Sequence, residues 1–557
     1  MGLLLRFWHL DSKPLWLDEV ITALFTLGRS YQEIPLDTLF PATVLDQVFA
    51  YRPGVSCAAI AHRVTTESVH PPLFFCLLYQ WIGWMPDGNW VWAMRSLPAL
   101  LGVGAIAALF HLNRIAFSTP AGLMGAALMA VSPFAVYLSQ EARHYTLPML
   151  LVTLALAALV QMQQDLQHQK IRPQVWIGWV LLNLLGLYVH YLVALAIAAQ
   201  VGALAAWMIW QRRNLCWRDW GRALLATGAI ALGYLPWLPM FLAHLTRPET
   251  DWLKPYDPDW LDRLAPIYQA LSGWVLMVVA LPVEEQPWAI ALPAIVVMVG
   301  FVLWLTRQVW QGLRRCWQHP NLRSPLFLLG GFVLFSLVEF FTIVYGLGKD
   351  ITVVPRYNFV YYPAVCALLG ASLTPFSATG ASQPLPLQWL SRRGAIALLA
   401  GLCSSLMVVN GLVFQKPYYP DQVAQTLYRG SEDPLVLVVS YRSLQEVALG
   451  LSFALELRKL YPTQPALPLR LGFLSAAEGN PPVWRILPHL EQDLPLPLDL
   501  WIVATPGVRI RNFPDQLRVN DPATSNPRPK GTCDRNPEET HRLGFPYQLY
   551  HCNPSGQ

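Results

Sequence analysis

Residues 286–306 read QPWAIALPAIVVMVGFVLWLT, a run that contains no Asp, Glu, Lys or Arg. An α-helix needs about 20 apolar residues to cross the roughly 30 Å hydrocarbon core of a bilayer, because each residue adds about 1.5 Å. This stretch therefore predicts a membrane-spanning helix, and it suggests the fold class of the chain around it.

Similar apolar stretches lie on both sides of this run. Residues 70–84 are apolar too, but they are few and begin with His70-Pro71-Pro72, so we expect an interfacial or re-entrant helix there. The sequence predicts an α-helical polytopic membrane protein with about 10–11 transmembrane helices. The other predicted spans lie near 93–113, 120–138, 145–163, 175–190, 191–210, 222–243, 326–346, 357–374 and 394–414.

The composition agrees with a membrane protein. Of the 557 residues, 54% are hydrophobic and only 13% are charged, against about 25% charged in soluble domains. The net charge of +5 is spread over short clusters between apolar runs, which is typical of topology signals and gives no reason to expect a nucleic-acid partner.

The basic clusters also predict sidedness, because cytoplasmic loops are enriched in Lys and Arg. They fall in alternate loops, so we expect the remaining loops and the tail to face the extracytoplasmic side of the plasma membrane. An outer loop that starts near Leu10 needs a preceding span, and Met1–His9 are too few for one. We therefore expect the natural chain to begin upstream. The basic clusters lie at 113–114, 167–172, 212–222, 307–323 and 392–393.

Two domains are predicted. Residues 1–415 form the transmembrane module, with residues 10–92 as its first outer loop, and residues 416–557 form a small extracytoplasmic α/β domain. In that domain we expect strands at Leu435–Ser440, Leu467–Ser475 and Asp499–Thr505, a helix at Ser443–Tyr461 and a loop at 519–540. Cys533 and Cys552 could pair in an oxidising compartment.

Charged and polar side chains gather in the predicted outer loops. Ionisable groups near a bilayer are costly, so these groups are candidates for function. Each also has an ordinary explanation: acids at a helix start act as caps, His-Pro-Pro begins a helix, and a surface ion pair contributes only about 0–1 kcal/mol. Only their collection on one side favours a site. The candidates are Asp18, Glu19, His70, Glu141, Arg143, Tyr145, His190, Arg356 and Tyr357.

Five motifs in order along the chain resemble those of the GT-C superfamily of membrane glycosyltransferases. The resemblance is to family 39, which includes protein O-mannosyltransferases and bacterial aminoarabinose transferases, and it covers residues 5–370. The motifs are PLWLDE (14–19), VHPPLFF (69–75), RSLP (95–98), SQEARHY (139–145) and PRY (355–357).

This resemblance implies transfer of a sugar, with inversion, from a polyprenyl-phosphate-linked donor to a hydroxyl of a glycan, lipid or protein acceptor. It implies that Asp18, with Glu19 beside it, and Glu141 are catalytic. It assigns Arg143, Arg356 and Tyr357 to the donor phosphate. His70, Tyr145 and His190 support the site. Some relatives use a divalent metal ion, and the spacing of His70, His190 and Glu141 leaves its presence open here.

Three other functions remain as alternatives. A transporter or lipid flippase should show internal repeats and broken helices at mid-membrane, whereas here the polar residues cluster near predicted helix ends. A glycan polymerase or ligase would also be polytopic with outer arginines, but the acidic pair ahead of His-Pro-Pro favours the GT-C interpretation. A non-catalytic assembly factor would tolerate loss of Asp18 and Arg143.

Overall fold

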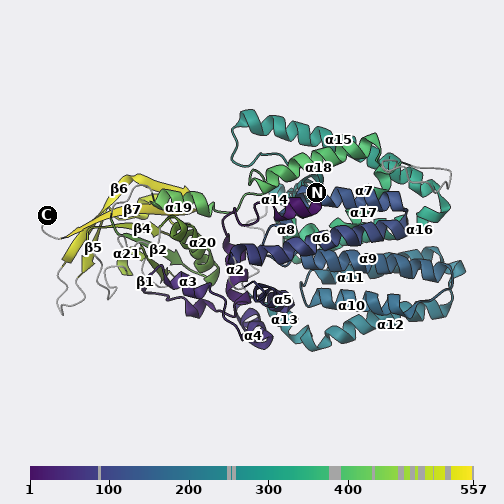
Figure 1. Ribbon diagram of the computed structural model, residues 1–557, viewed down its shortest axis with the longest axis horizontal. Coiled ribbons are helices and arrows are strands. Elements are labelled where there is room, and N and C mark those ends of the chain that lie inside the picture. Colours follow the sequence, from purple (N-terminus) through teal and green to yellow (C-terminus); the bar gives the residue numbers. More distant parts are fainter. Residues whose placement is uncertain are drawn as a thin grey trace. The chain divides into compact units, whose positions relative to one another are not determined.

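The computed structural model describes residues 1–85, 89–247, 253, 259–375, 390–428, 433–461, 469–476, 483–486, 496–505, 507–520 and 529–554 (Figure 1). The chain divides into two compact units. The helical unit comprises Met1–Leu10 and Val64–Phe414, and the sheet unit comprises Asp11–Arg63 and Gln415–Gln557. Most of the first outer loop, which the sequence analysis assigned to the membrane module, is thus grouped with the C-terminal tail.

Each of the ten predicted spans contains an apolar helix. Within the described residues, seven helical segments are long and apolar enough to cross a membrane, and the pair α7–α8, bent by 60°, gives an eighth. The other two predicted spans, 175–190 and 357–374, contain the shorter helices α10 and α17. The chain is therefore an integral, multi-pass helical membrane protein, as predicted. The bounds are α6 (Trp90–Ala116), α7 (Thr119–Ala130), α8 (Pro133–Ser139), α9 (Thr146–Gln167), α10 (Pro173–Leu187), α11 (Val193–Trp210), α12 (Trp217–Tyr234) with η3 (Leu235–Trp237) and α13 (Leu238–Leu245), α15 (Trp288–Gln318), α16 (Pro320–Leu347), α17 (Tyr362–Leu373) and α18 (Arg392–Val409).

The bend between α7 and α8 has a local cause. Pro133 lies in the first turn of α8, where a proline is tolerated but cannot continue the preceding helix. The Ser132 hydroxyl caps the new helix by accepting from the Ala135 amide (3.4 Å), and it donates to the Met277 carbonyl (2.7 Å). The break therefore directs α8 toward the end of the bundle that carries residues 140–145.

Small residues let the helices of this unit approach closely. A Cβ at Gly370 of α17 would collide with the backbone of Gly125 of α7, and one at Gly312 of α15 would collide with the Ser372 carbonyl. The Asn113 side chain joins two further chain segments by donating to the carbonyls of Ala121 and Ala367, each at 3.1 Å. Such close contacts and interhelical hydrogen bonds stabilise helix association in lipid.

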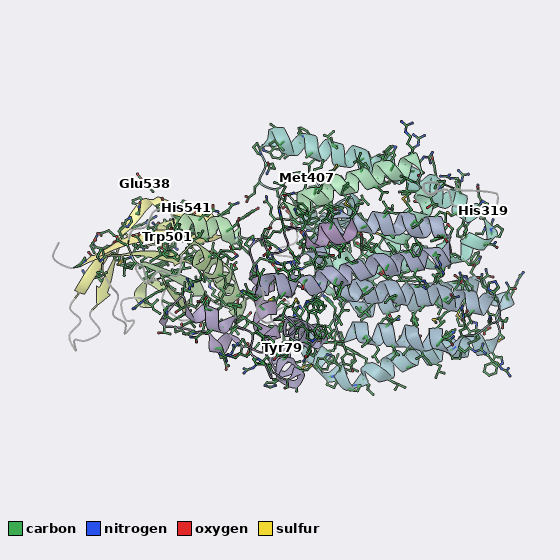
Figure 2. The ribbon with its side chains drawn as sticks, in the orientation of Figure 1. Tyr79, His319, Met407, Trp501, Glu538 and His541 are labelled. Atoms are coloured by element: carbon green, nitrogen blue, oxygen red, sulfur yellow. A yellow bond between two sulfur atoms is a disulfide. The ribbon has the colours of Figure 1, made fainter. Side chains whose placement is uncertain are left out.

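Other helices of the helical unit are too short or too polar to span a membrane. Helix α5 (Leu73–Ile82) has 10 residues and is about 15 Å long, half of a bilayer core. This length fits the interfacial helix expected for residues 70–84. Helix α14 (Trp260–Val278) lies in the segment 244–285, for which the sequence analysis predicted no helix. The turn at His319 between α15 and α16, inside a basic cluster, lies at one end of the helical bundle (Figure 2). The remaining short elements are α1 (Gly2–Phe7), η2 (Arg212–Asn214), η5 (Ile351–Val353) and η6 (Pro355–Val360).

The sheet unit is a mixed α/β structure. Seven described strands lie in the order β1-β3-β2-β4-β7-β6-β5, with β3, β2 and β4 parallel and the others antiparallel. The central strands are almost wholly buried, which explains their continuous apolar sequence. The elements are α2 (Leu17–Thr26), η1 (Tyr31–Glu33), β1 (Leu39–Pro41), α3 (Val44–Val48), α4 (Cys57–Glu67, which crosses the unit boundary), α19 (Pro420–Tyr428), β2 (Leu435–Tyr441), α20 (Leu444–Leu460), β3 (Leu469–Ser475), α21 (Val483–Ile486), β4 (Leu498–Val503), η8 (Ile510–Asn512), β5 (Gln516–Asn520), β6 (Pro529–Leu543) and β7 (Phe545–Pro554).

The predicted strands at 435–440, 467–475 and 499–505 and the helix at 443–461 are all present, with small shifts at their ends. The predicted loop at 519–540 is wrong for its described part, because residues 529–543 form β6. Its polar residues are tolerated in a strand that pairs with β5 and β7, since backbone groups supply the ladder. Cys533 and Cys552 form a disulfide between paired positions of β6 and β7.

Candidate active site

The turn between α8 and α9, residues 140–145, is buried throughout. The Gln140 amide fixes its first residue by donating to the carbonyls of Leu5 (3.1 Å) and Trp8 (2.9 Å). The backbone amide of Arg143 donates to the Glu141 carbonyl at 2.7 Å, which tightens the turn. Glu141 and Arg143 are only 2% and 3% exposed. Buried charges need partners or a ligand, so this turn is an unusual place for them.

Two guanidinium groups flank one aromatic ring in this region. The Cζ atoms of Arg143 and Arg356 each lie 5.7 Å from the centre of the Tyr145 ring. The Arg356 Nε also donates to the Tyr145 hydroxyl at 2.9 Å. Arg356 stands on η6, 211 positions further along the chain than Tyr145. The structure therefore brings together the fourth motif (139–145) and the fifth motif (355–357) within the helical unit.

Three histidines from three separate turns lie next to these arginines. The ring centres of His70 and His144 are 5.1 Å apart, and those of His144 and His190 are 4.7 Å apart. Burial, and then the nearby Arg143 guanidinium, lowers the pKa of His70 to about 3. Burial also holds the pKa of His144 and of His190 well below the usual value. All three imidazoles are therefore neutral at physiological pH.

The hydrogen bonds of these histidines differ. His70 Nδ1 lies 2.7 Å from the Ser68 hydroxyl, and His190 Nδ1 accepts from the Leu192 amide at 3.1 Å. His144 is 1% exposed, and neither of its ring nitrogens has a hydrogen-bond partner among the described residues. A buried polar group without a partner requires an explanation, and a bound molecule or water is the usual one.

Aromatic side chains enclose the histidines. The His190 ring lies 6.1 Å from the Tyr357 ring and 5.0 Å from the Phe359 ring, and Phe74 contacts His144 at 6.0 Å. Tyr357 and Phe359 both come from η6, beside Arg356. We use the term arginine–histidine cluster for this assembly of the helical unit. It consists of His70, Glu141, Arg143, His144, Tyr145, His190, Arg356 and Tyr357.

A second layer fixes the segment that leads to His70. The Trp237 indole donates to the Tyr191 hydroxyl (3.3 Å), which lies 2.7 Å from His244 Nδ1, and His244 Nε2 reaches the Thr65 carbonyl at 3.2 Å. Arg247 donates to the carbonyls of Thr65 (2.7 Å) and Ser68 (2.9 Å). Neither His244 nor Arg247 was predicted from the sequence. The available signal was His244 in the last turn of an apolar helix, with Arg247 two residues after its end.

An apolar groove of about 590 Å³ lies beside the cluster. It is formed by residues of α10, α11, α12 and α13, among them Ala194, Ile197, Ile230 and Phe241. Tyr191, which follows His190 in sequence, belongs both to this groove and to the hydrogen-bonded second layer. The groove is thus linked to the cluster through adjacent positions of the chain, Tyr191 in its lining and His190 in the cluster.

The acidic pair of the first motif lies in the sheet unit. Asp18 and Glu19 occupy the first turn of α2, where the helix dipole stabilises negative charge. Glu19 is fully buried and forms an ion pair with Lys416 at 3.4 Å, and the Lys416 ammonium lies 5.7 Å from the centre of the Trp16 ring. The sequence analysis missed Lys416, because no spacing connects it to the motif. The meeting of Asp18 with the arginine–histidine cluster stays a prediction.

The residues of this region do not fit a metal site. Within the described part of the chain, no three His, Cys, Asp or Glu side chains lie where they could hold an ion. The His144 ring packs against the rings of His70 and His190, with planes 56° apart in both pairs. Arg95 of the third motif is buried and donates to the Leu10 carbonyl at 2.9 Å.

The sequence of residues 69–239 matches the family of dolichyl-phosphate-mannose-protein mannosyltransferases. This range begins at the His-Pro-Pro motif and includes the 140–145 turn and His190. No curated protein is significantly similar to the chain.

The fold is similar to that of ArnT from Cupriavidus metallidurans over 98% of this chain and 96% of ArnT, at 12% sequence identity. The TM-score is 0.53 for the apo state and 0.51 for ArnT bound to undecaprenyl phosphate. The archaeal oligosaccharyltransferase AglB from Archaeoglobus fulgidus is similar over 78% of this chain and 60% of AglB, with a TM-score of 0.42 and 15% identity. The family match and the ArnT fold confirm the predicted resemblance to the GT-C superfamily.

Proposed function

We propose that this protein transfers a sugar from a polyprenyl-phosphate-linked donor to an acceptor hydroxyl on the extracytoplasmic side of the membrane, with inversion at the anomeric carbon. The observation that carries the proposal is the pair of guanidinium groups, Arg143 and Arg356, that flank Tyr145 next to His144. Both ring nitrogens of His144 are without a partner among the described residues.

The guanidinium pair suits the phosphate of the donor. A guanidinium fork matches phosphate oxygens with charge-assisted hydrogen bonds, and such bonds are strongest in a buried site. The neutral imidazoles can donate an N–H to the same oxygens without adding charge. ArnT, which has this fold, is known with undecaprenyl phosphate bound, and this supports a lipid phosphate as the ligand.

The apolar groove suits the lipid tail of the same donor. Its lining is mainly aliphatic and aromatic, and it includes Tyr191, the residue that follows His190. An isoprenoid chain in the groove would leave its phosphate beside the cluster. The hydrophobic contact contributes affinity, whereas the arginines select the phosphate.

In the proposed reaction, Asp18 accepts the proton of the acceptor hydroxyl. The acceptor oxygen forms a bond to the anomeric carbon while the bond from that carbon to the phosphate oxygen breaks. A single displacement inverts the configuration, and the polyprenyl phosphate leaves with its charge neutralised by Arg143 and Arg356. Glu19 holds Lys416 and so positions the first turn of α2. Glu141 is proposed to orient the arginines.

No step passes through a metal ion, because the described residues do not form a ligand set. The disulfide between Cys533 and Cys552 supports an extracytoplasmic location for the sheet unit, since disulfides persist in oxidising compartments.

The test is transfer by purified protein in lipid nanodiscs that contain a series of polyprenyl-phosphate sugars. We expect release of free polyprenyl phosphate coupled to a glycosylated acceptor, and its loss when Arg143 and Arg356 are both replaced by Ala. Movement of the donor across the bilayer without sugar transfer would instead identify a flippase. Loss of transfer in EDTA that Mg²⁺ or Zn²⁺ restores would contradict the metal-free mechanism.

A further inference from the structure

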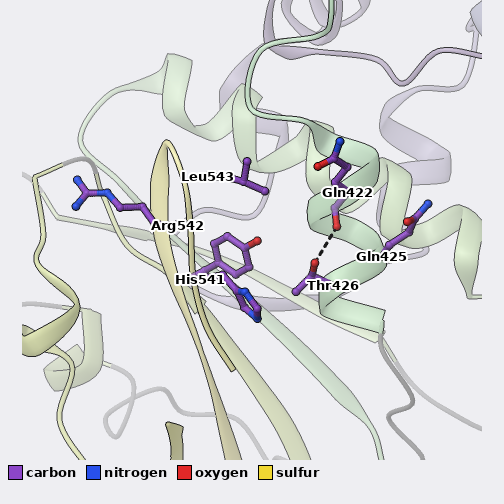
Figure 3. Close-up of a pocket in the computed structure, with 7 residues that line it drawn as sticks. Gln422, Gln425, Thr426, His541, Arg542 and Leu543 are labelled. Carbon is purple, nitrogen blue, oxygen red and sulfur yellow. Dashed lines mark hydrogen bonds between the residues drawn. The ribbon is translucent and has the colours of Figure 1, made fainter. Parts of the chain in front are cut away.

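A second cavity, of about 550 Å³, lies within the sheet unit, between α19 and the turn of the β6–β7 hairpin (Figure 3). Its volume is within the roughly 300–1,000 Å³ that small-molecule sites occupy. No residue of the five motifs and no residue of the proposed mechanism lines it. The hairpin turns at Gly544, whose φ of +76° favours glycine.

One wall of this cavity is a polar helix face. Gln422, Gln425 and Thr426 line it from α19, and positions three and four apart lie on one side of a helix. The opposite side of α19 is buried through Val423 and Leu427. Figure 3 shows the three polar side chains on the helix beside the hairpin, with the Thr426 hydroxyl bonded to the Gln422 carbonyl at 3.0 Å.

The two glutamines have free hydrogen-bonding capacity. Neither side-chain amide bonds to another residue in the described part of the chain, and both side chains are exposed. Each amide offers two donors and one acceptor in a plane. This combination matches neighbouring hydroxyl groups, which also donate and accept.

The other wall is aromatic. The His541 and Tyr547 rings are stacked, with centres 5.3 Å apart and planes 26° apart, and Trp501 lies 5.8 Å from Tyr547 and 6.2 Å from His541. Figure 2 shows Trp501 and His541 close together in the sheet unit. Tyr547 and Trp501 are each 2% exposed and lie behind the partly exposed His541 ring. The His541 ring can pack against the apolar C–H face of a sugar ring, while the hydroxyls at the sugar-ring edge meet the amides.

The charges around the cavity are nearly balanced and do not select a strongly anionic ligand. Arg542 is the cation that lines it, and in Figure 3 its side chain points away from α19. The carboxylate of Glu539 lies 2.7 Å from His541 Nε2, beside the aromatic wall. One acid and one base leave little net charge, whereas a phosphate site would concentrate positive charge.

We propose that this cavity binds a neutral saccharide and that it holds the acceptor glycan of the transfer reaction. The part of the proposal that concerns the acceptor rests on the proposed glycosyltransferase function. Saccharide binding itself does not depend on that function. The site would make the acceptor a glycan or glycoconjugate with uncharged sugars, rather than a protein lacking sugars.

The experiment uses saturation-transfer NMR to measure trisaccharide binding to the full-length protein in detergent. The ligands are mannotriose, maltotriose, chitotriose and the anionic trigalacturonate. We expect binding of at least one neutral trisaccharide. The double substitution Gln422→Ala and Gln425→Ala should weaken it by about tenfold or more, because both amides lose their hydrogen bonds. Gln445→Ala, an exposed glutamine on α20 outside the cavity, is the matched control. His541→Ala is a second, independent variant of the aromatic wall.

Three results would overturn the proposal: no neutral trisaccharide binds, trigalacturonate binds more tightly, or the control weakens binding as much as the double variant. The variant Asp18→Asn separates the two proposals. It should bind the trisaccharide like the unsubstituted protein while losing transfer. If it keeps transfer, the catalytic proposal fails and the saccharide site stands.

Discussion

The arginine–histidine cluster of the helical unit is buried and rich in charge, whereas the saccharide cavity of the sheet unit is open and nearly neutral. Arg143 and His144 are 3% and 1% exposed, while Gln422 and Gln425 lie on an exposed helix face. Electrostatic interactions strengthen as water is excluded. We therefore expect a substitution in the buried cluster to weaken ligand binding far more than one in the open cavity.

The largest effect is expected at Asp18, the proposed base, which lies in the sheet unit outside both of these regions. Asp18→Asn keeps the size of the side chain but removes its basicity, so sugar transfer should fall by about 10²–10⁴-fold. The measurement is the initial rate of transfer with a saturating polyprenyl-phosphate sugar. Asp11→Asn, an exposed acid in the same segment, is the control. Equal rates for Asp18→Asn and the unsubstituted protein would remove Asp18 from the chemistry.

The next effect concerns stability within the sheet unit. Lys416→Met leaves the Glu19 carboxylate buried without the ammonium 3.4 Å away, and removal of one partner of a buried ion pair costs about 3–5 kcal/mol. The double variant Glu19→Gln with Lys416→Met should recover much of this loss, since no lone charge remains. Thermal unfolding of the four proteins of this cycle measures it. Additive losses would mean that the pair does not interact.

A smaller effect is expected for one guanidinium group of the cluster. Arg143→Ala should raise the donor KM by roughly 10–100-fold, because charge-assisted hydrogen bonds contribute about 1.5–3 kcal/mol. Arg143→Lys keeps the charge but loses the fork, so its donor KM should lie between those of the unsubstituted protein and Arg143→Ala. Arg172→Ala, which breaks an ion pair with Asp165 in a different loop, should leave the KM unchanged. Identical KM values for the Ala and Lys variants would contradict bidentate phosphate binding.

The smallest effect, about 1.4 kcal/mol for each pH unit, is a pH dependence of stability. Burial lowers the pKa of His70 to about 3, whereas an unfolded imidazole titrates near 6.5. Between pH 6.5 and about 3 the unfolded chain therefore binds a proton that the folded chain does not, and stability falls as the pH falls through this window. His70→Asn should flatten the slope of the unfolding midpoint against pH, and His111→Asn, at an exposed position, should not. An unchanged slope in His70→Asn would contradict a neutral, buried His70.

Much of the helical fold was predictable because it depends on local composition. A run such as 286–306 must lie in lipid whatever its neighbours are, and α15 covers it. The secondary structure of polar segments was harder to predict than that of apolar runs. Residues 529–543 form a strand through pairing with distant segments, and α14 lies in a segment that apolar length did not mark as helical.

The candidate site was predictable only as a set of residues on one predicted side of the membrane. The polar residues of the predicted outer loops included His70, Arg143, His190 and Arg356, which the structure brings together around His144 and Tyr145. His244 and Lys416 were missed, because each acts through a partner more than 150 positions away. No pattern of neighbouring residues encodes such a pairing.

The sequence by itself determined that this chain spans a membrane many times, that a buried α/β sheet follows, and which motifs carry unusual charge. These properties follow from the hydrophobicity and order of neighbouring residues. Only the tertiary structure decided that Arg356 lies against Tyr145, that Glu19 pairs with Lys416, and that α19 faces the β6–β7 hairpin across a cavity. Those contacts join residues far apart in the chain, and the packing of the helices and strands between them sets the distances.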